Sequence, residues 1–195
     1  MVKKLVSVIV VNWNGKQHLE DCFSSLLKQD YPALEIIMVD NASSDWSVEF
    51  IKNKFPAVHL IQNKINIGFG PAVNKGMSIG KGEYFLFLNN DLTLAPSCIS
   101  ELATLMEKPE VGGSIPKILF FDKRETINSF GVDVNYVGIA CPRLIYEKDS
   151  ESLKEEEVPC GGIFMLHRNI LKKVRGFDES IFFYHEDHDL SWRIR

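Results

Sequence analysis

The chain of 195 residues has only four cysteines, and none of them form a Cys-x-x-Cys pair. Such wide spacing argues against a zinc site and against a disulfide scaffold. It favours free or buried thiols in a reducing compartment. We therefore expect a cytoplasmic protein. The cysteines are Cys22, Cys98, Cys141 and Cys160.

Long hydrophobic runs are also missing. No apolar run approaches the ~20 residues that a helix needs to cross a bilayer. Residues 1–11 have two lysines and a short apolar run interrupted by Ser7, without a small-residue cleavage site. We expect no transmembrane segment, and peripheral association with the inner face of a membrane stays open.

The chain has no surplus of basic residues, and its formal net charge is −4. Residues 147–157 contain six acidic residues and two lysines, so the net charge of this segment equals that of the whole chain. We expect this segment to be a solvated loop. A protein that binds nucleic acid usually presents a broad basic face. We therefore expect no nucleic-acid partner.

A glycine fingerprint for dinucleotides is absent where it should stand. The first predicted strand leads to Asn12-Trp13-Asn14-Gly15 instead of Gly-x-Gly-x-x-Gly. This absence makes a Rossmann-type oxidoreductase the weakest of the alternatives.

Apolar runs do alternate with amphipathic segments up to residue 110. This alternation predicts a Rossmann-like α/β fold, with a mainly parallel mixed sheet flanked by helices. From residue 111, three strands without intervening helices predict an antiparallel or mixed extension. Predicted strands cover 5–11, 35–39, 58–61, 84–88, 111–121, 126–134 and 158–167. Predicted helices begin directly after residues 14, 43, 70, 95, 167 and 185.

The first predicted helix has Leu19, Cys22, Phe23, Leu26 and Leu27 at i, i+3, i+4, i+7 and i+8. This spacing predicts one apolar face, and Asn14 is the expected N-cap. Later, Pro71 is expected at the first position of a helix.

Polar residues follow the predicted strands at 12–14, 40–41, 66–74 and 89–91. The carboxyl ends of parallel strands meet at one edge of a sheet, where ligands bind. An aromatic ring, amides and two carboxylates suit a nucleotide, with Asp91 at a metal-diphosphate. Asn and Asp also make turns at strand ends. For one such site a turn is the better interpretation, but four together favour a ligand site.

A second polar cluster is His185-Glu186-Asp187-His188-Asp189. Two imidazoles and three carboxylates could bind a metal or move a proton. An acidic helix start that complements the helix dipole explains Glu186 and Asp187 equally well. Taken alone, the segment leaves both interpretations open.

Six ordered motifs resemble those of family-two inverting glycosyltransferases with the A-type fold, most closely the rhamnosyltransferase-like branch. They lie at 6–15, 39–45, 66–74, 87–91, 161–168 and 176–190. The resemblance spans essentially the whole chain. It implies a single catalytic domain over 1–195, with a nucleotide-sugar-binding half at 1–110 and an acceptor-side half at 111–195.

The resemblance also implies roles for individual residues. Asp187 corresponds to the catalytic base and Glu186 is its catalytic neighbour, while Asp91 is the ligand of Mn²⁺ or Mg²⁺. Asn89 stands where many relatives have an aspartate, and a neutral amide weakens cation binding. The donor-binding residues are Val11, Trp13, Asp40, Asn41, Gly68, Asn74, Asn89, Asn90 and Asp91, and the acceptor side has Gly161 and Gly162.

The implied activity is inverting transfer of a hexose or deoxyhexose to an acceptor hydroxyl. The implied donor is a UDP- or dTDP-linked sugar, and the acceptor is a saccharide or lipid-linked saccharide of a cell-surface polysaccharide. A non-catalytic nucleotide-sugar-binding module is the main alternative. The last predicted helix reaches residue 195 without a C-cap glycine or proline, so we expect a domain truncated at its carboxyl terminus.

Overall fold

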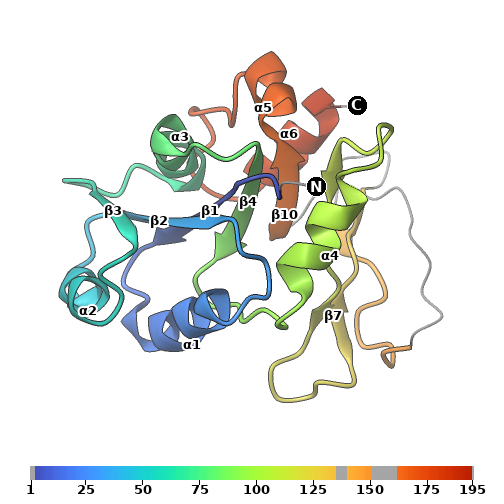
Figure 1. The fold of residues 1–195 in the computed structure, drawn as a ribbon, viewed down its shortest axis with the longest axis horizontal. Helices are drawn as coiled ribbons and strands as arrows, with labels where there is room; N and C mark the ends of the chain where they lie inside the picture. Colours follow the sequence, from blue (N-terminus) through green and yellow to red (C-terminus); the bar gives the residue numbers. More distant parts are fainter. Residues whose placement is uncertain (1–2, 135–139, 151–161, 195) are drawn as a thin grey trace.

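A single six-stranded sheet forms the centre of the protein (Figure 1). The structure is a computed structural model that describes residues 3–134, 140–150 and 162–194. The strand order is β3-β2-β1-β4-β10-β5. The first four strands in the chain are parallel, whereas β10 is antiparallel to both β4 and β5. The strands are β1 (Val6–Asn12), β2 (Leu34–Asp40), β3 (His59–Gln62), β4 (Tyr84–Asn89), β5 (Gly113–Ser114) and β10 (Ile163–His167).

Helices cover both faces of this sheet, which confirms the predicted fold class. One hydrophobic cluster joins α1, α2 and α4 to one face, and a second joins α3, α5 and α6 to the other. The helices are α1 (Lys16–Leu27), α2 (Ser47–Lys54), α3 (Phe69–Ile79), α4 (Cys98–Leu105), α5 (Arg168–Val174) and α6 (Glu186–Ile194).

The inner strands are apolar on both sides because both faces of the sheet are covered. In β1, Val8 and Val10 pack into the cluster of α1, while Ile9 packs into the cluster of α3. This two-sided burial explains why the strands appear in the sequence as continuous apolar runs and not as alternating ones.

The region between residues 113 and 142 forms short strands, where the sequence predicted two long ones. Apart from β5, β6 pairs with β7 and β8 pairs with β9 in two separate ribbons. These strands are β6 (Ile118–Leu119), β7 (Ile127–Ser129), β8 (Val132–Val134) and β9 (Ala140–Pro142). Most of the acidic segment, residues 151–157, lies outside the described residues.

Three predictions of helix ends and faces were wrong. The N-cap of α1 is Gly15, and Asn14 instead takes a left-handed conformation and accepts a hydrogen bond from the Ser44 amide. Leu27 is 60% exposed, so the apolar face of α1 ends at Leu26. The helix α3 begins before Pro71, which lies in its first turn, where its missing N–H costs little.

Within the described part of the chain, no helix combines the length and the apolar character needed to cross a membrane.

The residue Gly76 allows α3 to lie close to β1. A Cβ atom there would lie 2.7 Å from Ile9 Cγ2 and 3.2 Å from Val39 Cγ2. We expect Gly76→Val to lower the free energy of unfolding by about 1–3 kcal/mol, because extra atoms in a packed core force neighbours apart. Urea denaturation measures this change. The matched control is Ser78→Val at an exposed position of α3, and an equal loss in both variants would contradict the packing argument.

Candidate active site

A buried asparagine at the end of β1 connects the tips of three strands. The Asn12 amide nitrogen donates to Asp40 Oδ1 and to Ser43 Oγ, each at 3.0 Å. Its amide oxygen accepts a hydrogen bond of 2.6 Å from the Asn90 side chain. The network therefore holds the polar ends of β1, β2 and β4 together. The sequence places Asn12 among the strand tips but does not indicate that it lies at the centre of a network.

The turn after Asn12 passes very close to this network. A Cβ atom at Gly15 would lie 2.2 Å from the Asn90 amide nitrogen and 2.8 Å from Asn12 Oδ1, so only glycine fits. Trp13, in the same turn, is 59% exposed. Its ring is accessible for stacking, while Val11 beside it is half-buried.

Asp40 and Asn41 are buried behind the strand tips and bonded within the protein. Asp40 accepts from Asn12 and from the Ser43 amide. Asn41 donates to the Gly68 carbonyl at 3.0 Å and accepts from Asn63 at 2.8 Å. Their side chains therefore shape the edge of the sheet, and a base or ribose would have to compete with these hydrogen bonds to reach them.

The loop before α3 links this edge to the carboxyl-terminal part of the chain. Gly68 has a φ of +89°, and a Cβ atom there would lie 2.5 Å from the carbonyl oxygen of Phe182. The Phe69 amide donates to the same oxygen at 3.2 Å. Gly68 is therefore bonded to the strand tips through Asn41 and packed against the segment that precedes α6.

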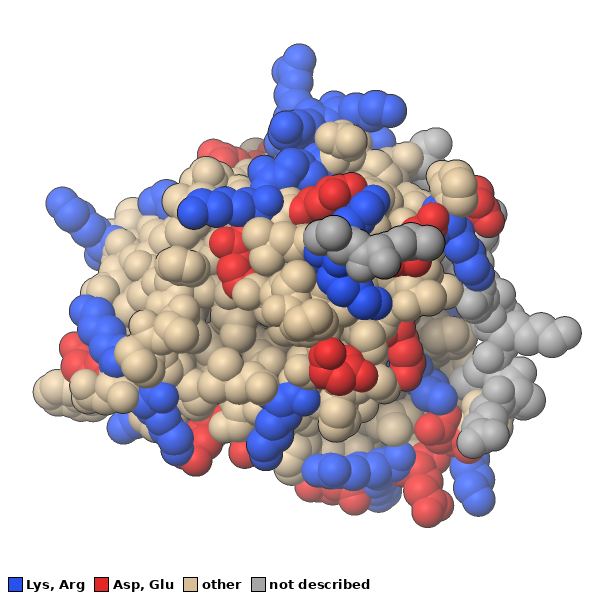
Figure 2. All heavy atoms as spheres, viewed as in Figure 1, with Lys and Arg blue, Asp and Glu red and all other residues tan. Residues whose placement is uncertain are grey.

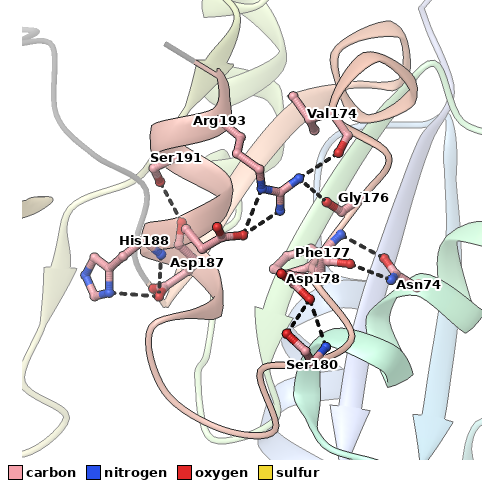
Figure 3. A network of polar contacts seen from close by, with 11 residues as sticks. Asn74, Val174, Gly176, Phe177, Asp178, Ser180, Asp187, His188, Ser191 and Arg193 are labelled. Carbon is pink, nitrogen blue, oxygen red and sulfur yellow. Dashed lines mark hydrogen bonds and ion pairs between the residues drawn. The ribbon is translucent and has the colours of Figure 1, made fainter.

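Asn74 has a structural task that the sequence did not indicate. Its amide accepts from the Phe177 N–H at 3.0 Å and donates to the Phe177 carbonyl at 2.9 Å (Figure 3). It also donates to Glu179 at 3.1 Å. These contacts bridge about a hundred residues of sequence and hold the segment after α5 on α3.

The tip of β4 presents one carboxylate to solvent. The Asn90 side chain donates its hydrogen bond to Asn12, and Asn89 is half-buried. Asp91 is exposed, and the described residues offer it no hydrogen-bond or ion-pair partner. Because Ile163 pairs with Leu88 in antiparallel register, Gly162 lies at the level of Asn89. Gly161 falls outside the described residues.

The donor set at this tip fits a divalent cation that takes most of its ligands from a substrate. Mg²⁺ is usually bound by one or two carboxylates together with phosphate oxygens and water. Asp91 supplies one carboxylate, and Asn89 lies two residues earlier in the sequence. Among the described residues, no group of three or more His, Cys, Asp or Glu is placed to hold a metal alone, including the cluster at 185–189.

Two neighbouring carboxyl groups at the start of α6 differ in how deeply they are buried. Glu186 is 9% exposed, and its Oε2 atom is buried without a hydrogen-bond partner in the part of the chain that the structure describes. Burial raises the pKa of Glu186, and the nearby charge of Asp187 raises it further. Asp187 is more accessible, with 18% of its side chain exposed. The accessible carboxylate is therefore Asp187.

Arg193 fixes the orientation of α6 (Figure 3). Its guanidinium pairs with Asp189 one turn earlier, at 2.7 Å. It also donates to the carbonyl oxygens of Val174 and Gly176, at 2.6 and 2.9 Å, at the end of α5. Asp189 is therefore engaged in an ion pair within the helix, and Asp187 takes no part in that pair.

Within the described chain, no hydrogen bond joins Asp91 or Gly162 directly to Glu186 or Asp187. The connection between the two parts of the site runs through Gly68 and Phe182. Near Asp187, three consecutive aromatic side chains, Phe182, Phe183 and Tyr184, are exposed.

Charges of both signs alternate over the face drawn in Figure 2, and Lys and Arg gather where α5 lies. Lys172 and Lys173 are in the last turn of that helix. This position suits the negative end of the helix dipole.

The chain resembles known proteins in sequence and in fold. The family described as Glycosyl transferase family 2 matches residues 7–175. An uncharacterized glycosyltransferase of Haemophilus influenzae is 36% identical over 107 residues, which are 53% of this chain and 33% of that protein.

Two solved structures share the fold. The mannosyltransferase PcManGT from Pyrobaculum calidifontis, in complex with GDP-Man and Mn²⁺, has a TM-score of 0.72 and 17% identity, covering 100% of this chain and 52% of that one. Residues 1–349 of TarS from S. aureus, in complex with UDP, have a TM-score of 0.68 and 19% identity, covering 97% and 54%. This chain thus spans about half the length of these structures.

The burial of Glu186 predicts a pH-dependent effect on stability. A carboxyl group with a raised pKa in the folded state opposes folding once it ionises, so this cost is absent below its ordinary value of 4.5 and grows as pH rises. We expect Glu186→Gln to raise Tm relative to the unmodified protein at pH 8, with a smaller gain at pH 4. Calorimetry measures the difference, and Glu49→Gln at an exposed position corrects for the lost charge. A gain that shrinks with rising pH would contradict the assignment.

Proposed function

Because the chain belongs to Glycosyl transferase family 2, we propose that it transfers a sugar, with inversion, from a nucleoside diphosphate to an acceptor hydroxyl. The observation that carries the proposal is the double attachment of Gly68. One side of this loop is bonded to the strand tips, and the other packs against the segment leading to Asp187. The loop therefore ties the proposed donor site to the proposed base.

In this proposal the donor lies along the carboxyl edge of the sheet. Trp13 stacks on the base, Val11 borders it, and the Asn12 network keeps these strand tips in place. Solved relatives of the same fold that bind GDP-Man or UDP support a nucleotide-sugar donor. A UDP- or dTDP-linked hexose or deoxyhexose is the donor that we propose for this chain, in keeping with the rhamnosyltransferase-like motifs.

Asp91 and Asn89, two residues earlier, would hold Mn²⁺ or Mg²⁺ at the donor diphosphate. Such an ion, when bound, neutralises the charge that develops on the leaving phosphate. The complex of PcManGT with Mn²⁺ supports this proposal. The neutral amide at Asn89 makes the protein's share of the binding smaller than that of two carboxylates.

The chemical step is one in-line displacement at the anomeric carbon. Asp187 takes the proton of the acceptor hydroxyl, the acceptor oxygen forms the new bond to carbon, and the bond to the diphosphate breaks. Gly162, beside Asn89, leaves room for the acceptor. The acceptor that we propose is a saccharide or lipid-linked saccharide in cell-surface polysaccharide synthesis.

The exchange Asp187→Asn tests the base. We expect it to lower turnover about 10²- to 10⁴-fold, the contribution that general bases usually make. Turnover is measured as release of nucleoside diphosphate from whichever UDP-, dTDP- or GDP-linked sugar gives the largest thermal shift. The thermal shift itself should be unchanged, because the donor does not contact this carboxylate.

The control for this variant is Asp21→Asn, the same change at an exposed position of α1, which should retain turnover. An active Asp187→Asn protein would exclude Asp187 as the base. Donor binding without turnover in the unmodified chain would favour the non-catalytic binding module.

A second experiment tests Asp91. A ligand present at 100 times its Kd raises the free energy of unfolding by about 2.7 kcal/mol. We expect Asp91→Ala to remove most of the Mn²⁺-dependent part of the nucleotide-induced rise in Tm, and Asn89→Asp to enlarge it. Asp122→Ala, at an exposed position between β6 and β7, is the control. An unchanged Mn²⁺ titration in Asp91→Ala would refute the metal assignment.

A further inference from the structure

His188 contacts the carboxylate of Asp187 with two groups. Its backbone N–H donates to Asp187 Oδ1 at 2.9 Å. Its ring nitrogen Nδ1 lies 3.2 Å from the same oxygen (Figure 3). The described residues give Asp187 Oδ2 no partner. The two oxygens of this carboxylate are therefore unequal: Oδ1 is held and Oδ2 is open.

The surroundings of the ring determine where its proton lies. Two lone pairs would repel at the distance between Nδ1 and Oδ1, so this contact requires a proton on Nδ1. The other nitrogen, Nε2, is buried and has no hydrogen-bond partner among the described residues. A proton there would be buried without an acceptor. The neutral imidazole with its proton on Nδ1 satisfies both conditions.

The neighbouring His185 is compatible with this tautomer. Its Nδ1 atom lies 3.3 Å from His188 Nδ1. When His188 carries the proton on Nδ1, His185 presents a lone pair to it. The ring of His188 is then held between a carboxylate oxygen and a second imidazole, with 19% of its side chain exposed.

We propose that His188 is a positioning residue that holds Asp187 Oδ1 and leaves Oδ2 as the oxygen that removes the acceptor proton. This inference rests on the proposed role of Asp187 as the base. The acceptor O–H bond breaks and its proton moves to Oδ2. The acceptor oxygen bonds to the anomeric carbon, and the electrons of the sugar–phosphate bond leave with the nucleoside diphosphate. His188 keeps its proton throughout.

Kinetics of two substitutions test the proposal. His188→Leu removes the ring donor, whereas His188→Asn places an amide nitrogen near the position of Nδ1. We expect His188→Leu to lower kcat about 10- to 100-fold, because small errors in the orientation of a reacting group are costly. The KM for the nucleotide sugar should stay within about twofold, because the donor lies elsewhere. His188→Asn should recover most of kcat, and His59→Leu, on the far edge strand, should have no effect.

Two kinetic outcomes would overturn the proposal. One is an unchanged kcat in His188→Leu. The other is an equal loss in the Leu and Asn variants that follows their loss of Tm, as a packing role would give. If Asp187→Asn is inactive while His188→Leu is fully active, only the positioning role fails. If Asp187→Asn is active, the proposed function itself fails.

A spectroscopic measurement tests the contact without any turnover. In protein labelled with ¹⁵N-histidine, long-range ¹H–¹⁵N spectra distinguish the two neutral tautomers. We expect His188, assigned with the His188→Asn variant, to have its proton on Nδ1 in the unmodified protein. In Asp187→Ala the proton should stay on Nδ1, because Nε2 remains buried and His185 still accepts from Nδ1, but the Nδ1 resonance should shift because the carboxylate oxygen is lost. A proton on Nε2 in the unmodified protein, or an Nδ1 resonance that is unchanged in Asp187→Ala, would overturn the proposal.

Discussion

The antiparallel pairing of β10 with β4 is the interaction on which the arrangement of the other elements depends. It places a strand from the second half of the chain beside β4, the outer strand of the parallel set formed by the first half. Arg168, directly after β10, donates to the carbonyl oxygens of Gly80 and Gly82 and lies over the ring of Phe85. β10 is paired along both edges and Arg168 holds its carboxyl end, so α5 begins at a fixed point, and α5 and α6 pack on the face that carries α3.

The polar network around Asn12 fixes the carboxyl ends of β1, β2 and β4. Buried amides and carboxylates cost free energy unless they are hydrogen-bonded, and a fully bonded network makes one arrangement strongly preferred. Asn12, Asp40 and Asn41 meet this condition with partners from the strand tips and from the loop at Gly68. The edge that faces the proposed donor is therefore shaped by groups that do not need to touch it.

The fold was predictable where local patterns and tertiary packing agree. Tyr84 to Leu88 is apolar because both faces of β4 are covered, and the order of the first four strands and helices followed from such runs. Helix ends were less predictable. Asn14 looks like a cap, but Ser44, thirty residues later, competes for its side chain. The short β6–β9 ribbons also escaped prediction, because their pairing depends on partners far along the chain.

The same reason limits prediction of the site. The exposed position of Asp91 agrees with its place after a buried strand. The bonds of Asn74 to Phe177 join residues 103 positions apart, and no local pattern records them. The burial of Glu186 beside the accessible Asp187 was equally invisible, since adjacent helical residues point to different sides and only the fold decides which side is covered.

Arg193 has a consequence for motion. Its guanidinium is bonded to its own helix and to the end of α5, while Asn74 and Phe69 anchor the segment between the two helices. These contacts restrain α5 and α6 relative to each other and to α3. In the proposed function, they would hold the carboxylate of Asp187 in place before any substrate arrives, so that little reorganisation of this helix would add to the barrier.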